Sequence, residues 1–272
     1  MFRFDLDTDA LAEAYGRASP LLFLAGKRLI HALGLKPGHR VLDVGCGTGL
    51  LAEYVARQIG ADGLVVGIDP LPRRIAIARR RERPNLTFQI GTADDLGAFP
   101  DRSFDAAYLH LVFHWLPDKI APLRQLHRVL KAGAPLGLTT SAGECENTFE
   151  RARATVLAQP PYDAFRDDAE ARIHHVSSDE LERVLDEAGF DVSRIEREPT
   201  SAEWPTAEEA IAFSETIAAG NLFGHLPERL RARACTDLAA VLDRQRRDGL
   251  IRVEGARILA LAVARASTVK EE

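Results

Sequence analysis

The feature that most constrains the fold is a short apolar run, residues 41–44, that leads into three glycines at alternating positions. Gly45, Gly47 and Gly49 are followed at once by a helical pattern over residues 50–59. Because glycine has no Cβ, the main chain can turn sharply there and approach a ligand closely. The N–H groups that begin the helix favour an anionic or carboxylate-bearing ligand. The pattern therefore predicts a strand–loop–helix unit that wraps its backbone around a small cofactor.

The second apolar run helps to separate two classes of cofactor. A nicotinamide dinucleotide fingerprint would place its third glycine at position 50, which is Leu50 in this chain. Residues 64–68 are followed by Asp69, which comes twenty residues after Gly49. A carboxylate at this place can hold both hydroxyls of a ribose. The spacing favours a ribose-bearing cofactor, and a nicotinamide oxidoreductase stays as a competing hypothesis.

The motif Asp43-x-Gly45-x-Gly47-x-Gly49, followed by Asp69, resembles the S-adenosylmethionine-dependent methyltransferases of the Rossmann-like class. Within that class, the chain is similar to the small-molecule subgroup. The resemblance implies S-adenosylmethionine as cofactor and S-adenosylhomocysteine as product. It also implies an α/β fold: a seven-stranded, doubly wound, Rossmann-like sheet that is mostly parallel, with an antiparallel last strand and a helical lid insertion.

The resemblance covers residues 37–140 closely and the remainder in outline. Two positions depart from the family pattern: Thr92 stands where an aspartate is usual, and residues 132–134 replace Pro-Gly-Gly. The first departure leaves open whether Thr92 or Asp94 meets the adenine amino group. The matching segments beyond the glycine loop are 91–96, 99–105 and 128–133.

Cofactor-binding residues are implied near the carboxyl ends of the strands, where open α/β sheets bind ligands. In relatives, an aromatic residue from the N-terminal segment closes over the methionine carboxylate, and Tyr15 is expected to do so here. His110, at the end of the fourth expected strand, is either a cofactor contact or a general base. The implied set is Tyr15, Asp43, Gly45, Cys46, Gly47, Gly49, Asp69, Pro70, Thr92, Ala93, Asp94 and His110.

Substrate contacts are expected just after the fourth strand, at His114-Trp115. Carboxyl methyltransferases similar to this chain often carry Gln-Trp or His-Trp at this place, where the pair contacts substrate. We predict His114 and His110 as catalytic residues, and His114, Trp115 and Trp204 as substrate contacts. The structural alternatives are a hydrogen-bonded helix-start residue for His114 and core packing for Trp115.

Composition agrees with a soluble enzyme that has one substantial core and a lid, since 46% of its 272 residues are hydrophobic and 28% are charged. No apolar run approaches the roughly 18 residues needed to span a bilayer, and the first residues lack the pattern of a secretory signal. The prediction is a cytoplasmic protein without a membrane partner. A net charge of −5 disfavours a nucleic-acid partner.

The three cysteines form no pair at metal-ligand or redox spacing, which fits a reducing compartment and predicts no metal site. Cys46 lies inside the glycine loop, where a small residue suffices. Cys145 and Cys235 are the residues that a metalloid-methylating alternative would use.

We expect an N-terminal helical cap segment at 1–35, a cofactor-binding core at 36–140, and substrate-side insertions, lid helices and closing strands of the same domain at 141–272. His174-His175 is expected at the surface, as a pair without acidic partners. Expected strands are 40–44, 64–69, 86–90, 104–110, 135–140, 190–196 and 257–263, and expected later helices are 147–157, 178–188, 206–219 and 227–247.

The predicted function is methyl transfer to a small organic acceptor, with a carboxylate or hydroxyl oxygen favoured by His114-Trp115. Nitrogen, carbon, sulfur and metalloid acceptors stay open, because the cofactor half is common to all of them. A binding protein that senses the cofactor without chemistry is the alternative from another class.

Overall fold

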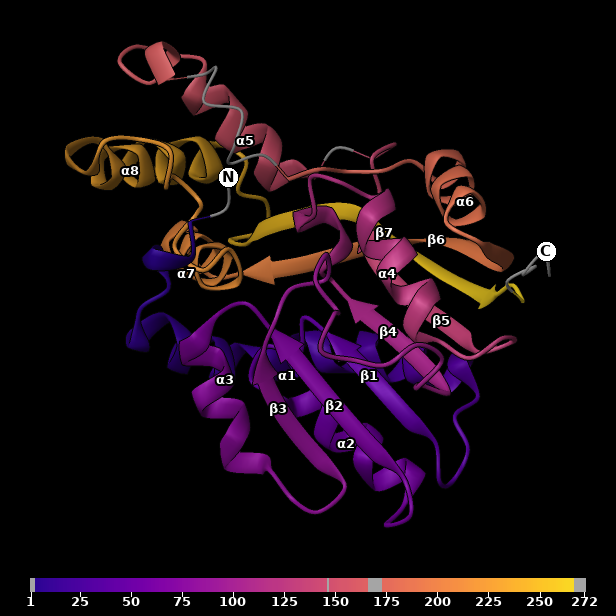
Figure 1. The fold of residues 1–272 in the computed structure, drawn as a ribbon. Coiled ribbons are helices and arrows are strands. Elements are labelled where there is room, and N and C mark those ends of the chain that lie inside the picture. The colour runs from indigo at the N-terminus through magenta and orange to yellow at the C-terminus, as the bar shows by residue number, and fades with distance from the viewer. Residues whose placement is uncertain (1–2, 146, 166–172, 267–272) are drawn as a thin grey trace.

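The computed structural model describes residues 3–145, 147–165 and 173–266, and in these residues seven strands form one sheet (Figure 1). The strand order is β3-β2-β1-β4-β5-β7-β6, and β7 pairs antiparallel with β5 and with β6, while the other pairings in this sheet are parallel. The expected doubly wound, mostly parallel sheet is therefore confirmed. The strands are β1 (Arg40–Val44), β2 (Leu64–Asp69), β3 (Leu86–Ile90), β4 (Ala106–His110), β5 (Pro135–Ser141), β6 (Phe190–Trp204) and β7 (Ile251–Ala264).

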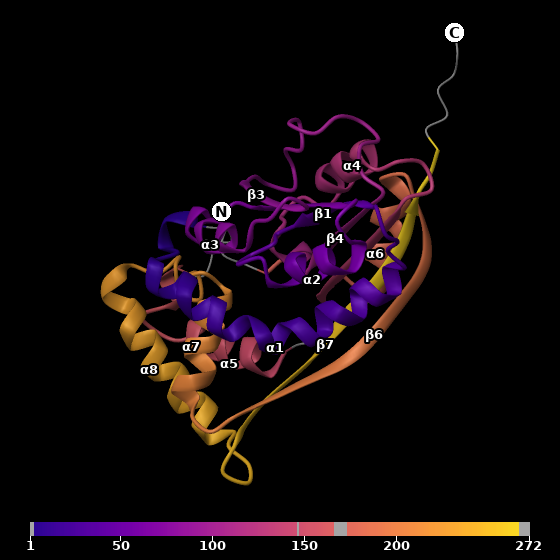
Figure 2. The same cartoon turned by 90° about the horizontal axis from the view of Figure 1, so that it is seen from below.

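Helices cover both faces of the sheet (Figures 1 and 2). On one face lie α1 (Asp9–Leu33), α2 (Leu50–Ile59) and α3 (Pro72–Ala78), which share an apolar cluster with the strands. On the other face lie α4 (Ile120–Val129) and α6 (Ser178–Glu187). The central strands are buried on both sides, which explains why they read as continuous apolar runs rather than as alternating patterns.

Three further helices gather away from the sheet and form what we call the cap (Figure 1). The cap consists of α5 (Thr148–Leu157), α7 (Ala207–Ile217) and α8 (Glu228–Arg244), together with the cap-side ends of β6 and β7. Its apolar side chains form a cluster of their own. The long β6–β7 ribbon connects this cluster to the sheet.

The last two strands are much longer than the sequence predicts. Expected at 190–196 and 257–263, they span 15 and 14 residues and pair from Phe190↔Ala264 to Trp204↔Ile251, with a bulge after Val192. Most of the added length of β6 consists of polar, charged and small residues that are exposed or half-buried, so it carries no apolar signal. The two strands satisfy each other's backbone groups, and Trp204, Ile251 and Val253 at their cap-side ends pack into the cap cluster.

The N-terminal residues dock onto the cap. The short 3₁₀ turn η1 (Phe4–Leu6) precedes α1, and Arg3 exchanges backbone hydrogen bonds with the side chain of Asn221, at 2.9 and 3.1 Å. The other 3₁₀ turns are η2 (Arg79–Arg81), η3 (Phe113–Trp115) and η4 (Asp163–Phe165). Among the residues that the structure describes, no helix has the length and apolar character needed to cross a membrane.

Candidate functional site

The glycine loop between β1 and α2 has a backbone that only glycine tolerates. Gly45, Gly47 and Gly49 all have positive φ, at 78°, 54° and 80°. A Cβ on Gly47 would lie 2.8 Å from the ring of Tyr15, and one on Gly49 would lie 2.6 Å from the ring of Phe88. The bare main chain is thus required both by conformation and by space.

Asp69, at the end of β2, is tied directly to this loop. Its carboxylate accepts hydrogen bonds from the backbone N–H of Gly47 and of Leu71, both at 2.9 Å. The residue is only 6% exposed, and this burial raises the pKa of the carboxyl group, while the nearby guanidinium of Arg74 lowers it. The acid expected to bind a ribose therefore lies against the loop expected to cradle the cofactor.

A second buried carboxyl group lies one strand away. Asp43 at the end of β1 accepts a 2.6 Å hydrogen bond from the hydroxyl of Tyr108 on β4. Burial raises the pKa of Asp43 to about 7, because the hydrogen bond offsets only part of the loss of solvation. This pair links β1 and β4 beneath the site.

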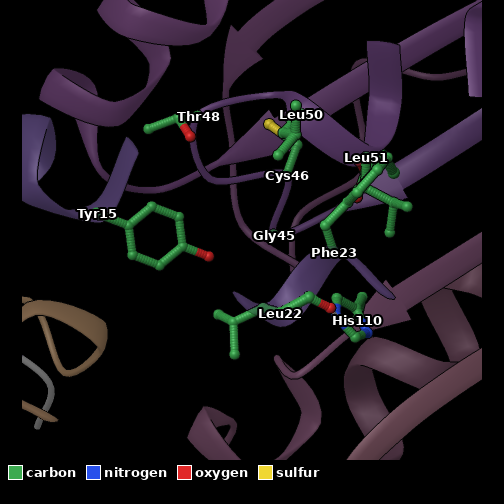
Figure 3. Close-up of a pocket in the computed structure, with 10 residues that line it drawn as sticks. Tyr15, Leu22, Phe23, Gly45, Cys46, Thr48, Leu50, Leu51 and His110 are labelled. Atoms are coloured by element: carbon green, nitrogen blue, oxygen red, sulfur yellow. Dashed lines mark hydrogen bonds between the residues drawn. The ribbon is translucent and has the colours of Figure 1, made fainter. Parts of the chain in front are cut away.

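The residues around the loop enclose a pocket (Figure 3). In the close-up the ring of Tyr15, from α1, stands opposite the glycine loop with its hydroxyl pointing toward the middle of the pocket. The guanidinium of Arg74 lies over that ring at 4.0 Å and donates to the carbonyl of Thr216 on α7. The pocket is lined by Tyr15, Leu22, Phe23, Asp43, Gly45, Cys46, Thr48, Leu50, Leu51 and His110.

His110 forms part of the pocket wall, and both of its ring nitrogens are hydrogen-bonded. Nε2 lies 3.1 Å from the carbonyl of Leu22, so it carries the hydrogen, and Nδ1 lies 2.8 Å from the hydroxyl of Thr139. Burial lowers the pKa of His110 to about 4. The imidazole is therefore neutral near pH 7 and fixes α1 against β4, an arrangement that suits a pocket wall better than a proton acceptor.

His114 and Trp115 lie side by side in η3, with ring centroids 5.1 Å apart. His114 is 6% exposed, and its Nδ1 lies 3.4 Å from the hydroxyl of Thr140. Burial lowers the pKa of His114 to about 3, so this imidazole is also neutral near pH 7. The geometry is compatible with the structural alternative for His114.

The donor set of the pocket fits S-adenosylmethionine. The glycine loop brings bare main chain to the pocket, and Asp69, which lies outside the pocket lining but is hydrogen-bonded to Gly47, offers a carboxylate for ribose hydroxyls. Within the described ranges, the buried hydroxyl oxygen of Thr48 has no hydrogen-bond partner, although the residue lines the pocket. A ligand with polar groups would satisfy such an atom, because an unpaired buried hydroxyl is costly.

Comparison with known families shows what this core is similar to. Residues 42–137, from β1 into β5, match the sequence profile of the family described as "Methyltransferase domain". These residues are therefore similar to methyltransferase domains.

Curated relatives match just under half of the chain. The 2-phytyl-1,4-naphtoquinone methyltransferase of Synechococcus elongatus is 38% identical over 136 residues, which cover 46% of this chain and 58% of the relative. The ubiquinone biosynthesis O-methyltransferase of Xanthomonas campestris is 37% identical over 133 residues, covering 47% and 54%. The chain thus spans little more than half the length of the curated relatives it matches.

Solved structures extend the likeness of fold beyond the methyltransferase domain. The phosphoethanolamine N-methyltransferase 2 of Haemonchus contortus, in complex with S-adenosyl-L-methionine, superposes with a TM-score of 0.61 at 17% identity, covering 98% of this chain and 60% of that one. The [4+2]-cyclase SpnF gives 0.55 at 23% identity, covering 92% and 81%. Since one of these proteins is named a cyclase, the shared fold does not by itself define a reaction.

Several residues predicted for the site lie outside the pocket lining of the methyltransferase domain. Thr92 pairs with Asp95 in the turn after β3, where Ala93 is buried and Asp94 is exposed. Pro70 is half-buried between β2 and α3. Their contacts with an adenine remain a prediction.

Trp204 stands at the end of β6, where its ring packs on Phe213 of α7 with centroids 4.8 Å apart. The structure therefore places Trp204 in the cap cluster. Its substrate role remains a prediction.

One polar pair was missed by the sequence reasoning. His175 was expected at the surface without an acidic partner, but its Nε2 lies 2.8 Å from a carboxylate oxygen of Glu150 on α5. Each side chain is only about a quarter exposed, at 28% and 25%. Only the packing of the cap brings together two residues that are 25 positions apart, and no local sequence signal marks the pair.

Proposed function

We propose that this chain transfers a methyl group from S-adenosylmethionine to a small organic acceptor. The proposal rests on one observation: the two elements expected to bind the cofactor, the glycine loop and Asp69, lie in contact with each other. The backbone N–H of Gly47 in the glycine loop donates to the carboxylate of Asp69 at the end of β2, at 2.9 Å. The match of residues 42–137 to a methyltransferase domain supports the same reaction class.

In this proposal, each pocket residue has a binding or positioning role. Bound S-adenosylmethionine would supply a methyl group activated on a sulfonium. Asp69 would accept hydrogen bonds from the ribose, the glycine loop would lie against the adenosyl group, and Thr48 would meet a polar group of the methionine part. Tyr15 would close the pocket from α1, and His110 would hold that helix in place. Such positioning supplies much of the rate of a bimolecular transfer.

The acceptor we propose is a small organic molecule of the quinone-related kind, which takes the methyl group on one of its oxygen atoms. Curated relatives are named for naphthoquinone, ubiquinone and menaquinone methylation, at oxygen in one case and at carbon in another. These matches cover less than half of the chain, and in this proposal the cap and the segment after β5 surround the acceptor. His114-Trp115, at the boundary of the two parts, supports oxygen as the acceptor atom.

Calorimetry and a labelled-methyl assay test the proposal together. S-adenosylhomocysteine is expected to bind, and NAD is expected not to bind. Methyl-labelled S-adenosylmethionine is then supplied with catechol, hydroquinone or a set of small carboxylic acids, and methylated products are identified by mass spectrometry. Binding of NAD in place of S-adenosylhomocysteine would overturn the reaction class. Cofactor binding without label transfer to any probe would favour the non-catalytic alternative.

A further inference from the structure

We propose that His175, oriented by Glu150, is the general base of this site, and that the acceptor atom is a hydroxyl oxygen that still carries its proton at neutral pH. The inference rests on the proposed function and narrows it, since a carboxylate or a hydroxyl would otherwise serve equally. Four observations on the described residues support it. They are the hydrogen bond between His175 and Glu150, the unpaired Nδ1 of His175, the position of this pair in the fold, and the lowered pKa values of the two neighbouring histidines.

The hydrogen bond fixes which nitrogen of His175 bears the hydrogen. An ionised carboxylate only accepts, so at 2.8 Å from Glu150 the Nε2 atom must donate. In the neutral ring the lone pair then lies on Nδ1. That atom is screened from solvent and has no hydrogen-bond partner among residues 3–145, 147–165 and 173–266. A carboxylate on one nitrogen and a free lone pair on the other are the arrangement of an oriented base.

The position of the pair is the substrate side of the sheet. The backbone N–H of His174 donates to the carbonyl of His114 at 2.8 Å, and Val176 pairs with Ala142 just beyond the end of β5. His175 thus lies above the carboxyl ends of β4 and β5, where ligands of open α/β sheets bind. Burial lowers the pKa of His114 most, and His175, Lys119 and His110 add smaller electrostatic effects in the same direction. The three imidazoles therefore extend from the cofactor pocket outward to the cap.

The two histidines nearer the pocket are poorly suited to accept a proton. His110 uses both nitrogens in structural hydrogen bonds, and burial lowers its pKa to about 4. His114 is buried, and its pKa is lowered to about 3. A base works best when its pKa lies near the working pH. The side chain of His175 is 28% exposed, whereas His114 is 6% exposed, and His175 has the carboxylate of Glu150 beside it.

Several charged groups surround this pair and belong to its electrostatic setting. Glu150 and Arg153 come from α5, and Glu150 raises the pKa of Arg153 against the effect of burial. Lys119 donates to the carbonyls of Phe113 and His174, and burial lowers the pKa of Lys119 to about 8. His114 faces His175 from η3. The cations favour an oxygen that develops negative charge, and the carboxylate favours the imidazolium that forms beside it.

The proposed step balances as follows. A lone pair of the acceptor oxygen forms the new bond to the methyl carbon while the carbon–sulfur bond breaks and leaves its electron pair on sulfur. The hydroxyl proton passes to Nδ1 of His175, and the resulting imidazolium is stabilised by Glu150 until solvent removes the proton. A carboxylate acceptor is already ionised at neutral pH and has no proton to lose. An oriented base is therefore of use to a hydroxyl acceptor and of no use to a carboxylate.

The sharpest variant is His175→Gln, because the glutamine amide nitrogen can still donate to Glu150 while the basic Nδ1 is lost. With catechol as acceptor, kcat is expected to fall by about 10²- to 10⁴-fold, the usual contribution of a general base, with KM and the Kd of S-adenosylhomocysteine changing less than about twofold. With 4-nitrocatechol, which ionises at much lower pH, the loss is expected to be far smaller. His174→Gln is the matched control and keeps wild-type kcat.

The variant Glu150→Gln tests separately whether Glu150 orients the His175 ring and whether its negative charge is needed. The amide oxygen still accepts from Nε2, but a neutral group no longer stabilises the imidazolium. The acidic limb of the kcat profile with catechol is therefore expected to move to lower pH. An equal loss of kcat for both catechols in His175→Gln, or an unmoved limb in Glu150→Gln, would assign the pair a purely structural role and overturn the proposal.

A readout without turnover completes the test. Nitrogen-15 NMR of the wild-type protein bound to S-adenosylhomocysteine is expected to report His175 as the Nε2–H tautomer, with a pKa that falls in Glu150→Gln. The Nδ1–H tautomer, or a pKa insensitive to Glu150, would refute the base. Wild-type turnover confined to carboxylic acids would overturn this inference while leaving the proposed methyl transfer intact, and failure to bind S-adenosylhomocysteine would instead remove the proposed function.

Discussion

The cofactor half of the molecule and the cap are built in different ways. In the cofactor half, residues 40–141, seven of the ten pocket residues lie in β1, in the loop and helix after it, or at the end of β4, while the other three come from α1. The family match at 42–137 lies entirely in this half. In the cap, contacts join distant parts of the chain. The hydroxyl of Tyr162 binds Asp237 across 75 positions. In the proposed function, the first region holds the cofactor and the second surrounds the acceptor.

Substitution in the glycine loop should give the largest loss of stability, through changes confined to the cofactor half. Gly49→Val combines a positive φ with a Cβ 2.6 Å from the Phe88 ring and 3.2 Å from the Cβ of Ala78. Strain and overpacking together are expected to lower the free energy of unfolding by about 3–5 kcal/mol, measured by urea denaturation.

Gly133→Val is the matched control, since Gly133 also has a positive φ, of 78°, but no described atom lies within 4 Å of an added Cβ. This variant should lose only about 1–2 kcal/mol of unfolding free energy, because a residue with a Cβ is strained at a positive φ. Equal losses in the two variants would mean that packing around the loop contributes nothing.

The next effect concerns cofactor affinity rather than folding. Asp69→Ala removes the carboxylate proposed for the ribose and also its bonds to Gly47 and Leu71. The Kd of S-adenosylhomocysteine is expected to rise by roughly ten- to a hundredfold, from charge-assisted hydrogen bonds of about 1.5–3 kcal/mol. Asp237→Ala, in the cap, serves as control in the same calorimetry and should leave the Kd unchanged. A rise in Kd of similar size for both would deny that the two regions are separate.

The features that could be predicted from the sequence lie mainly in the cofactor half, and those that could not lie mainly on the cap side. The glycine loop, Asp69 and the five parallel strands were predictable because each depends on a short stretch of chain. The full length of β6 was not predictable, since residues 197–203 are mostly polar or charged and carry no apolar pattern, and the length of β7 follows from its pairing with β6.

The functional side chains divide in the same manner. His110 was placed at a strand end by counting, and it lines the pocket. The partner of His175 could not be counted, because Glu150 reaches it from a cap helix whose position depends on tertiary packing alone. The roles of His114, Trp115 and Trp204 remain predictions, with Trp204 now located in the cap cluster.

Acidification should weaken the cofactor half through its buried histidines. Burial lowers the pKa of His110 to about 4 and of His114 to about 3, whereas an unfolded histidine titrates near 6.5. Below pH 6.5 the unfolded chain therefore binds more protons than the folded one, and stability falls with pH by up to about 1.4 kcal/mol per unit for each histidine.

The comparison to make is wild type against His114→Gln in urea denaturation between pH 7 and pH 4. Asp43 acts in the opposite direction, because burial raises its pKa to about 7, but its contribution is common to both proteins and cancels. The difference in unfolding free energy should shift in favour of the variant as pH falls. A difference that stays constant with pH would show that His114 is protonated in the folded protein.

The smallest expected effect comes from a substitution in the cap, which tests whether the cap and the cofactor half are energetically independent. Tyr162→Phe removes one 2.6 Å hydrogen bond to Asp237 and leaves the buried ring in the cap cluster. Because Asp237 is on the surface side of α8 and can turn to water, the loss of unfolding free energy should be about 1 kcal/mol, with an unchanged Kd for S-adenosylhomocysteine. If this small change instead weakened cofactor binding as much as Asp69→Ala, the cap and the cofactor half would be one cooperative site, and the acceptor side could not vary independently of the glycine loop.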